Sequence, residues 1–440
     1  MSAAKLQRAR YASDSPPPLL GVHAAEPGRY PALLESSTQH PSTGRYDILL
    51  AGAGETIVDS AFLPALGLAW RRERREVADH DLPFAGGWLV YLGYELAGEI
   101  EPSLRLPQTT TPRAFAQRVH GAAIYDHARR ETWLIAEPGH ARLLEEMALA
   151  LGSAQDPVQR TPIGLASLDE EPADLFMGRI AAARQHIAAG DIYQVNLSRG
   201  WRGRLAQAKS PAQLYAGLRH SNPSPFGAIA HLPWMSVLST SPERLVESRH
   251  GQVQTRPIAG THPRVGNDRD VIAALTAHPK ERAEHVMLLD LERSDLGRIA
   301  EAGTVTVDEY AIIESYAHVH HIVSNVRGRL RSDVSPVDVI RAVFPGGTIT
   351  GCPKVRSMQI IAALEAEPRG AYTGSLGYLS LDGSLDLNIL IRTATVRADE
   401  VKFRTGAGIV ADSDPERELE ETRAKARGLL RAFTTDVEAS

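Results

Sequence analysis

Residues 375–409 read SLGYLSLDGSLDLNILIRTATVRADEVKFRTGAGI, and this stretch decides the fold class. Apolar and polar residues alternate in three runs, which are Ser375 to Leu381, Leu385 to Val396 and Val401 to Ile409. The segments between the runs, Asp382-Gly383 and residues 398–400, are typical of turns. The pattern therefore predicts an antiparallel meander of three strands.

Segments on the N-terminal side of this meander mix strands with helices. The periodicity predicts strands at Arg45–Ala51, His120–Tyr125 and Asp191–Ser198, and helices at Ala141–Leu151 and Asp174–Gly190. Because these strands and helices do not alternate strictly, a Rossmann or barrel fold is disfavoured and an α+β fold is expected.

Local composition divides the chain into four parts. Residues 153–172 are rich in polar residues, proline and glycine without a sustained period, which is typical of a linker. Residues 1–20, with their proline run, are interpreted as a mobile N-terminal arm, and residues 21–152 as an N-terminal region. Nearly all motifs that could carry chemistry fall in residues 173–436, which are therefore the expected catalytic core.

Bulk properties indicate a globular protein that acts on small molecules or on another protein. The 440 residues are 43% hydrophobic and 23% charged, and the net charge of −5 is spread over interspersed acidic and basic residues. No basic face for nucleic acid or anionic lipid is expected. The most apolar stretch, Gly86–Tyr94, is far shorter than the ~20 residues of a membrane-spanning helix. A single cysteine, Cys352, excludes an intramolecular disulfide framework and, with no secretory signal, favours a cytoplasmic location.

A helix predicted from Pro279 to Asp295 carries a carboxylate on its apolar stripe. Glu284 falls in line with Met287, Leu288 and Leu291 at helical spacing. A buried carboxylate needs a cation, a metal or a proton, because burying it alone is costly. An ion pair with an arginine at the edge of the stripe explains the same spacing, so both interpretations stay open.

The last predicted helix, Glu416–Phe433, places Glu421 and Lys425 one turn apart on the same face. A surface ion pair is the ordinary explanation of this spacing. However, the segment Gly406-Ala407-Gly408 precedes the helix, and its small residues let backbone N–H groups approach an anion closely. The carboxylate, the ammonium and the glycine-lined segment together indicate a site for a metal and a carboxylate substrate.

Arg392 is a candidate ligand for a carboxylate. It shares the even-numbered face of its predicted strand with Asp386 and Asn388, while apolar residues occupy the other face. A guanidinium on a strand can clamp a carboxylate through two hydrogen bonds. A solvated sheet face explains the alternation equally well.

Several other motifs are excluded as cofactor or nucleophile sites. A zinc site is disfavoured at the histidines of positions 318, 320 and 321, with His285 as a possible further ligand. Their spacing lacks the distinctive pattern of zinc ligands. Residues 346–354, GGTITGCPK, fit neither of the common nucleotide-binding motifs. Cys352 within that segment lacks the context of a glutaminase nucleophile, so we expect that the chain does not make ammonia from glutamine.

In this order, the motifs of the chain resemble those of the chorismate-binding enzymes. The resemblance is carried by DIYQVNLS (191–198), SPER (241–244), RPIAGTHPR (256–264), KERAEHVMLLDLERSDLGRI (280–299), FPGGTITGCPKVRSMQII (344–361), RGAYTGSLGY (369–378), DLNILIRT (386–393), GAGIV (406–410) and EETRAK (420–425). It covers about Asp174 to Ala432, and LLES (33–36), GRYDILLA (44–51) and GGWLVYLGYE (86–95) extend it more loosely. The family includes anthranilate synthase component I, aminodeoxychorismate synthase component I, isochorismate synthase and salicylate synthase.

The resemblance implies a fold, a metal and a substrate site. The fold would be α+β, with two large antiparallel β-sheets packed face to face and flanked by helices. Mg2+ would be held by Glu284 and Glu421, which it bridges to the ring carboxylate of chorismate. The positions that contact the substrate in the family match Thr261, Thr348, Tyr372, Arg392, Gly406, Ala407, Gly408 and Lys425.

The resemblance also implies catalytic groups. Glu243 matches the acid that protonates the departing C4 hydroxyl, a role that requires a raised pKa. His321 matches the histidine associated with acid/base work during pyruvate loss, and Thr348 matches a polar position facing the ring. Ala259 stands where aminodeoxychorismate, isochorismate and salicylate synthases carry a lysine and where anthranilate synthases carry alanine.

Within the family, the residues of the motifs GRYDILLA, FPGGTITGCPK and DLNILIRT resemble aminodeoxychorismate synthase component I more than anthranilate synthase. Such a subunit converts chorismate and ammonia to 4-amino-4-deoxychorismate in p-aminobenzoate and folate biosynthesis, with ammonia from a separate glutamine amidotransferase. Ala259 keeps anthranilate synthesis as the alternative. A non-catalytic homologue that binds chorismate or a glutaminase is a third hypothesis, which the presence of the acid and metal-binding positions disfavours. Ser36 and Arg45, together with Asn222 and Pro223, resemble tryptophan-binding elements of anthranilate synthase.

Overall fold

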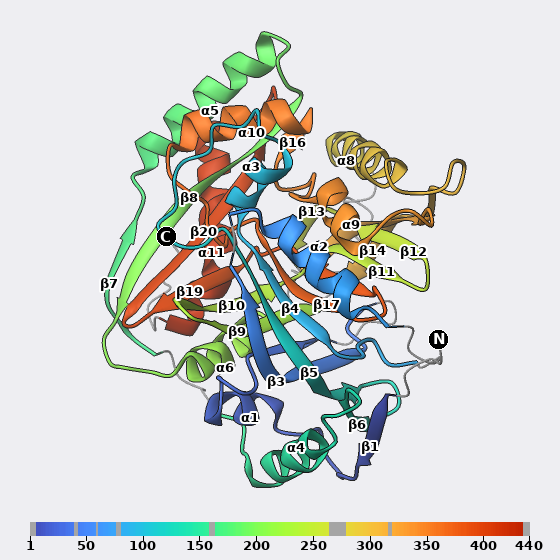
Figure 1. Ribbon diagram of the computed structural model, residues 1–440. Helices are drawn as coiled ribbons and strands as arrows, with labels where there is room; N and C mark the ends of the chain where they lie inside the picture. Colours follow the sequence, from blue (N-terminus) through green and yellow to red (C-terminus); the bar gives the residue numbers. More distant parts are fainter. Residues whose placement is uncertain are drawn as a thin grey trace.

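The computed structural model describes residues 6–38, 43–58, 60–75, 81–157, 163–263, 279–315 and 319–433. Within these ranges the chain forms a large antiparallel sheet with flanking helices (Figure 1). The strands are β1 (Gln7–Tyr11), β2 (Ala32–Glu35), β3 (Tyr46–Ile57), β4 (Gly87–Leu92), β5 (Ala114–Asp126), β6 (Glu131–Ala136), β7 (Leu165–Glu170), β8 (Gln194–Leu205), β9 (Phe226–Leu232), β10 (Met235–Ser241), β11 (Arg244–Arg249), β12 (Gln252–Arg256), β13 (Ile258–Pro263), β14 (Thr306–Ser315), β15 (Val319–Arg329), β16 (Gly351–Cys352), β17 (Ser375–Ser380), β18 (Leu385–Asn388), β19 (Thr393–Arg397) and β20 (Glu400–Ile409). The helices are α1 (Leu19–Ala25), α2 (Phe62–Glu73), η1 (Tyr94–Leu96), α3 (Ala97–Ile100), α4 (Arg142–Ser153), α5 (Ala173–Ala188), α6 (Pro211–Ser221), α8 (Pro279–Gly297), α9 (Pro336–Val343), α10 (Lys354–Glu365) and α11 (Pro415–Phe433).

The strands of the described ranges pair antiparallel and belong to one continuous hydrogen-bonded network. The expected α+β class with extended antiparallel sheets is confirmed, and the strands expected in two sheets are joined through shared pairings. Consecutive residues are buried along much of β3, β5 and β20, so both faces of the sheet are covered at these strands. The sheet therefore provides a rigid frame in which strands distant in sequence bring side chains together.

The deciding stretch at residues 375–409 forms strands, but its middle run is broken. β18 ends at Asn388 and β19 begins at Thr393, and the two strands pair with different neighbours, β11 and β10 respectively. The prediction of one strand from Leu385 to Val396 is therefore wrong. Its physical reason is Arg392, whose φ of 49° is left-handed and incompatible with an extended strand.

The expected boundaries in the N-terminal third do not coincide with breaks in the structure. β1, within the expected arm, pairs with β6, and β7, within the expected linker, pairs with β8. β2 also pairs with β9, and β4 pairs with β17. The expected N-terminal region and catalytic core therefore contribute strands to the same sheet.

Helices cover the sheet in two groups (Figure 1). α10 and α5 pack on β8, α11 packs on β20, and α6 packs on β10. α8 packs on β13 and β15, and α9 contacts both α8 and α2. No helix in the described part of the chain is both long and apolar enough to cross a membrane.

Candidate active site

Arg392 lies in the break between β18 and β19. Among the described residues, its guanidinium forms no hydrogen bond or ion pair. Burial lowers the pKa of Arg392, and the nearby charge of Glu243 opposes this shift. Arg392 is half-buried, and a guanidinium in such a position can take a carboxylate through two parallel hydrogen bonds. The companions expected on its face are engaged elsewhere, since Asp386 pairs with Arg244 at 3.0 Å and Asn388 accepts from the Leu376 N–H at 3.0 Å.

Glu243 lies between β10 and β11 and is 4% exposed. Burial raises the pKa of its carboxyl to about 7, and the charge of Glu292 adds to the shift. The Thr348 hydroxyl, the Ile258 N–H and Arg392 oppose it. Although Thr348 faces the carboxyl, neither Glu243 Oε1 nor Thr348 Oγ1 has a well-aligned hydrogen bond within the described ranges. The structure thus brings together a neutral acid, a hydroxyl and a cation, each with unused hydrogen-bonding capacity.

Glu292 on α8 was not singled out from the sequence, yet it supports this cluster. Its Oε1 accepts a hydrogen bond from the Gly347 N–H at 3.2 Å, so it fixes the backbone next to Thr348. Burial raises the pKa of Glu292 to about 7, with a further contribution from Asp295 and an opposing one from Lys354. Glu292 therefore acts on Glu243 both through the loop that carries Thr348 and through its charge.

The buried face of α8 differs from the predicted stripe. Its buried residues are His285, Leu288, Leu289, Glu292, Asp295 and Leu296. Glu284, Met287 and Leu291 are only half-buried, so the prediction was rotated about the helix axis by roughly one residue. Glu292 lies two turns after Glu284, and the periodicity through Leu288 to Leu296 is the sequence signal that could have found it.

β13 and β15 place three of the expected residues in register. Thr261 lies directly opposite His321, and Ala259 lies opposite Ile322. His321 is 1% exposed. Because Glu243 bonds the backbone N–H of Ile258, the strand carrying Ala259 passes beside the acid. The backbone register therefore groups these positions as expected. The side chains of Ala259 and Thr261 are outside the part of the chain whose side chains the structure describes.

The Gly406–Gly408 segment is part of β20, as the predicted run from Val401 to Ile409 requires. Gly406 and Gly408 pair with Ser198 and Asn196 of β8. The N–H groups of Ser198 and Asn196 bond Glu365 and Thr350 instead of β20, so both pairs are of the non-hydrogen-bonded type. Consequently, the N–H groups of Gly406 and Gly408 point to the open edge of β20.

Lys425 and Glu421 of α11 lie at this edge of β20. Lys425 Nζ donates to the Gly406 carbonyl at 2.9 Å and pairs with Glu421 Oε1 at 2.6 Å. The Glu421 side chain is 48% exposed, so the surface ion pair expected as the ordinary explanation is present. The same geometry leaves an ammonium, a carboxylate and two N–H groups along one strand edge.

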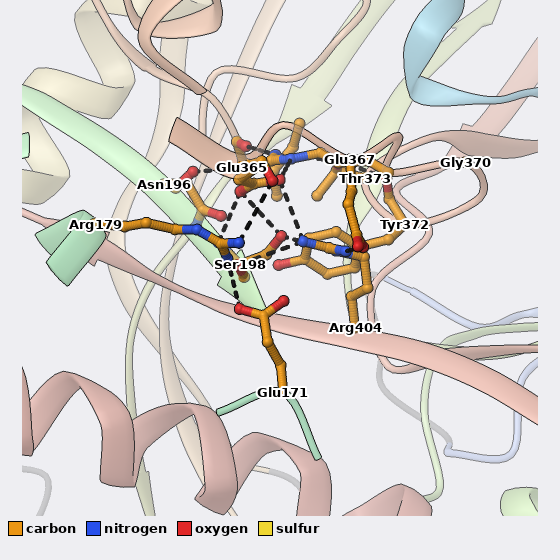
Figure 2. Close-up of polar contacts among 12 residues, drawn as sticks. Glu171, Arg179, Asn196, Ser198, Glu365, Glu367, Gly370, Tyr372, Thr373 and Arg404 are labelled. Atoms are coloured by element: carbon orange, nitrogen blue, oxygen red, sulfur yellow. Dashed lines mark hydrogen bonds and ion pairs between the residues drawn. The ribbon is translucent and has the colours of Figure 1, made fainter. Parts of the chain in front are cut away.

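Tyr372 joins the β20 group to a buried ionic network. A Cβ atom at Gly406 would lie 2.6 Å from the Tyr372 hydroxyl, so only glycine allows this approach. Burial raises the pKa of Tyr372 to about 12, which keeps its hydroxyl protonated. Figure 2 shows Glu365 among Ser198, Arg404 and neighbouring groups, and the carboxylate accepts from the Ser198 N–H at 2.8 Å and from Arg369 at 2.6 Å. These paired charges hold in place the residues that surround Tyr372.

Glu284 and Glu421 have the donor chemistry that Mg2+ requires. Both offer carboxylate oxygens, neither is fully buried, and they belong to different helices, α8 and α11. Glu421 pairs with Lys425 at 2.6 Å, and its half-exposed side chain leaves its second oxygen open to solvent. Hard oxygen donors that keep solvent access fit a magnesium ion, which retains several water ligands.

A second group of metal-ligating side chains fits an ion less well. One ligand atom from each of His120, Glu137 and His140 lies within 4.8 Å of the others. However, Arg118 engages both oxygens of Glu137, at 2.6 and 2.7 Å. The two imidazole rings are stacked with an interplanar angle of 7°, so their in-plane lone pairs do not converge on one point. This cluster is best described as a buried ion pair capped by histidines.

The elements expected to bind tryptophan lie near a cavity of about 270 Å³. Arg45 lines it, but Ser36, Asn222 and Pro223 do not; the remaining polar lining comes from Glu35, Tyr46, Arg244, Glu247, Arg249, Gln254, Tyr378, Asp386 and Asn388. Ser36 donates its N–H to Asp47 at 2.8 Å, and the Asn222 amide donates to the Thr240 hydroxyl at 2.8 Å. Arg45 pairs with Asp126 at 2.7 Å. The lining is mixed, since Leu34, Ile48 and Phe226 also contribute to it, and three of the four candidate residues lie outside it.

Comparison with known proteins agrees with this geometry. The family model for chorismate binding enzymes matches residues 31–431. An anthranilate synthase component I-like protein of Synechocystis sp. is 40% identical over 92% of this chain and 85% of its own, and aminodeoxychorismate synthase component 1 of Bacillus subtilis is 40% identical over 83% and 81%. Anthranilate synthase component I of Streptococcus pneumoniae superposes with a TM-score of 0.79 at 30% identity, covering 89% of this chain and 93% of its own. The chain belongs to the chorismate binding enzyme family.

Proposed function

We propose that this chain is aminodeoxychorismate synthase component I, which converts chorismate and ammonia to 4-amino-4-deoxychorismate. The observation that carries the proposal is the juxtaposition of a neutral buried acid, Glu243, with a half-buried cation, Arg392, that has no hydrogen bond or ion pair among the described residues. Chorismate offers a hydroxyl to be expelled and a carboxylate on its enolpyruvyl side chain. The acid and the cation match these two groups of one substrate.

The acid step follows from the environment of Glu243. With a pKa of about 7, the carboxyl is largely protonated up to neutral pH and can give its proton to the departing C4 hydroxyl, which leaves as water. Ammonia then forms a bond to the ring at C2, and a second ammonia adds at C4 as the C2 amine leaves. The small side chain of Ala259 provides room for ammonia where other members carry a lysine.

Arg392, Tyr372 and the β20 edge would bind the two carboxylates of chorismate. Arg392 and the Tyr372 hydroxyl would hold the enolpyruvyl carboxylate, and Lys425 with the N–H groups of Gly406 and Gly408 would hold the ring carboxylate. Bound Mg2+, held by Glu284 and Glu421, would neutralise the ring carboxylate. Thr348 and Thr261 would face the ring between these anchors.

The source of ammonia is proposed to be a separate glutamine amidotransferase subunit. Burial raises the pKa of the Cys352 thiol, so this cysteine is a poor nucleophile at neutral pH. The chain also lacks the sequence context of a glutaminase nucleophile. Ammonium salts should therefore replace glutamine for the isolated chain.

Anthranilate synthesis is a second candidate, and Ala259 is the observation that favours it. Anthranilate would form if the C2 amine were retained and pyruvate were eliminated, with His321 in the acid/base role. The relatives include proteins named for both activities at 40% identity, so identity does not choose between them.

One experiment tests the assignment. The purified chain is incubated with chorismate, Mg2+ and either ammonium chloride or glutamine, and the product is separated with and without aminodeoxychorismate lyase. We expect a non-fluorescent amino product that the lyase converts to p-aminobenzoate, from ammonium but not from glutamine. Fluorescent anthranilate as the sole product would establish the second candidate instead. Turnover with glutamine in the absence of a partner would refute the proposed ammonia source.

A further inference from the structure

Three consecutive hydroxyl side chains at the end of β10 line the break that contains Arg392. All three residues, Ser239, Thr240 and Ser241, are fully buried. Their contacts replace the interrupted strand ladder: the Ser241 hydroxyl donates to the Ile389 carbonyl at 2.5 Å, the Thr240 hydroxyl donates to the Arg392 carbonyl at 3.0 Å, and the Ser239 hydroxyl accepts from Thr393 at 2.8 Å. The break between β18 and β19 is therefore a well-ordered part of the sheet, held by side-chain hydrogen bonds.

Arg392 itself depends most on Thr240. The Arg392 carbonyl accepts both the Thr240 N–H, at 3.1 Å, and the Thr240 hydroxyl, at 3.0 Å. A left-handed backbone is unfavourable for arginine and persists only where the surroundings fix it. The direction in which the guanidinium projects follows from this backbone conformation, so a change at Thr240 acts on the position of the guanidinium.

Asn222 orients the Thr240 hydroxyl. Its side-chain amide donates to Thr240 Oγ1 at 2.8 Å, which leaves the hydroxyl proton directed at the Arg392 carbonyl. Asn222 is the C-cap residue of α6, and its Oδ1 lies 3.0 Å from where a Cβ atom at Gly428 of α11 would be. Asn222 therefore lies between α6 and α11, and this packing restricts the rotation of its side chain away from Thr240.

We propose that Thr240 is a positioning residue that holds Arg392 in its substrate-binding conformation, with Asn222 aligning the Thr240 hydroxyl. This inference rests on the proposed role of Arg392 in binding the substrate carboxylate. Thr240 does not touch the substrate and acts only through the backbone of Arg392. It also gives Asn222 a role other than a direct contact with tryptophan.

Thr240→Val tests the proposal, because valine keeps the shape of threonine and removes the hydroxyl. Loss of this buried hydrogen bond and the released amide of Asn222 should raise the KM for chorismate about tenfold, with a smaller change in kcat. Thr240→Ser retains the hydroxyl and should stay within about twofold of the wild type, and Asn222→Ala should show a weaker form of the valine effect. Thr395→Val, on neighbouring β19 away from the break, is the matched control and should leave KM unchanged.

A crystal structure of Thr240→Val separates this inference from the proposed function. We expect the φ of Arg392 to leave the left-handed region in the variant. If φ stays near 49° and KM is unchanged, Thr240 has no positioning role. If the wild type does not convert chorismate, the proposed function fails, while the conformation of Arg392 in the variant still decides the positioning role. If the valine variant does not fold, Asn222→Ala supplies the same two readouts.

Discussion

Glu243→Gln should make the protein inactive and, above neutral pH, more stable. The carboxyl of Glu243 has a pKa of about 7 in the folded state against the ordinary value of 4.5. The folded state therefore prefers the protonated form, and ionising Glu243 costs stability as the pH rises from 4.5 through 7. At about 1.4 kcal/mol for each tenfold change in an equilibrium constant, the cost approaches about 3 kcal/mol well above pH 7. Glutamine is isosteric and uncharged, so the variant avoids this cost.

The assay is urea unfolding of the wild type and the variant at pH 5 and pH 8, followed by circular dichroism. The gain of Glu243→Gln in unfolding free energy should grow by about 2 to 3 kcal/mol between the two pH values. Chorismate turnover should be lost at both, because the amide cannot protonate the C4 hydroxyl. An equal stability difference at pH 5 and pH 8 would refute the assignment of a neutral, buried acid at this position.

Glu247→Gln is the matched control with the opposite sign. The charge of Arg244 holds the pKa of Glu247 below its usual range, and the two side chains lie 3.3 Å apart. A carboxyl with a lowered folded pKa stabilises the protein above its unfolded pKa and loses that contribution as the pH falls. Glu247→Gln should therefore destabilise the protein by nearly the same amount at pH 5 and pH 8, which both lie above 4.5, and by less as the pH falls below 4.5.

Further substitutions test the proposed metal ligand Glu421, the effect of Glu292 on the pKa of Glu243, and the role of Ala259. Glu421→Gln should abolish turnover and weaken Mg2+ binding measured by calorimetry, whereas Glu420→Gln, next to it and paired with Arg423, should change neither. Glu292→Gln keeps an acceptor for the Gly347 N–H but removes a charge that raises the pKa of Glu243, so the alkaline limb of kcat/KM against pH should move to lower pH; a limb that does not move contradicts this link. Ala259→Lys should suppress any anthranilate, and anthranilate as the sole product of both wild type and variant would overturn the aminodeoxychorismate assignment.

Sequence periodicity located most of the strands and helices because it reflects burial along a single segment. The predicted strand Arg45–Ala51 overlaps β3, the predicted strand His120–Tyr125 lies within β5, and the predicted helix Ala141–Leu151 overlaps α4. The break at Arg392 was missed because apolar alternation continues through it. Its cause lies 148 residues earlier in the sequence, where Ser241 bonds the Ile389 carbonyl. A contact of that separation leaves no trace in a local pattern.

The candidate site was predicted unevenly for a related reason. Glu243, Thr348 and Arg392 were identified from motif resemblance and lie together in the structure. Glu292 was missed because α8 has adjacent leucines at positions 288 and 289, which allow two choices of apolar stripe. The strand that carries Gly406–Gly408 was predicted from the run Val401 to Ile409, but the direction of its N–H groups follows only from the pairing with β8.

Glu365 and the pair of Glu243 and Arg392 show two different outcomes of taking a charge out of water. Glu365 is surrounded by Arg369, Arg404 and Ser198, and these partners keep its pKa below the usual value despite complete burial. For Glu243 and Arg392, by contrast, burial moves the pKa of each group toward the neutral form. Such groups are costly to stability and persist where function requires them. In the proposed function, a substrate with a carboxylate for Arg392 and a leaving hydroxyl for Glu243 would supply the partners that both groups lack, and chorismate has both groups.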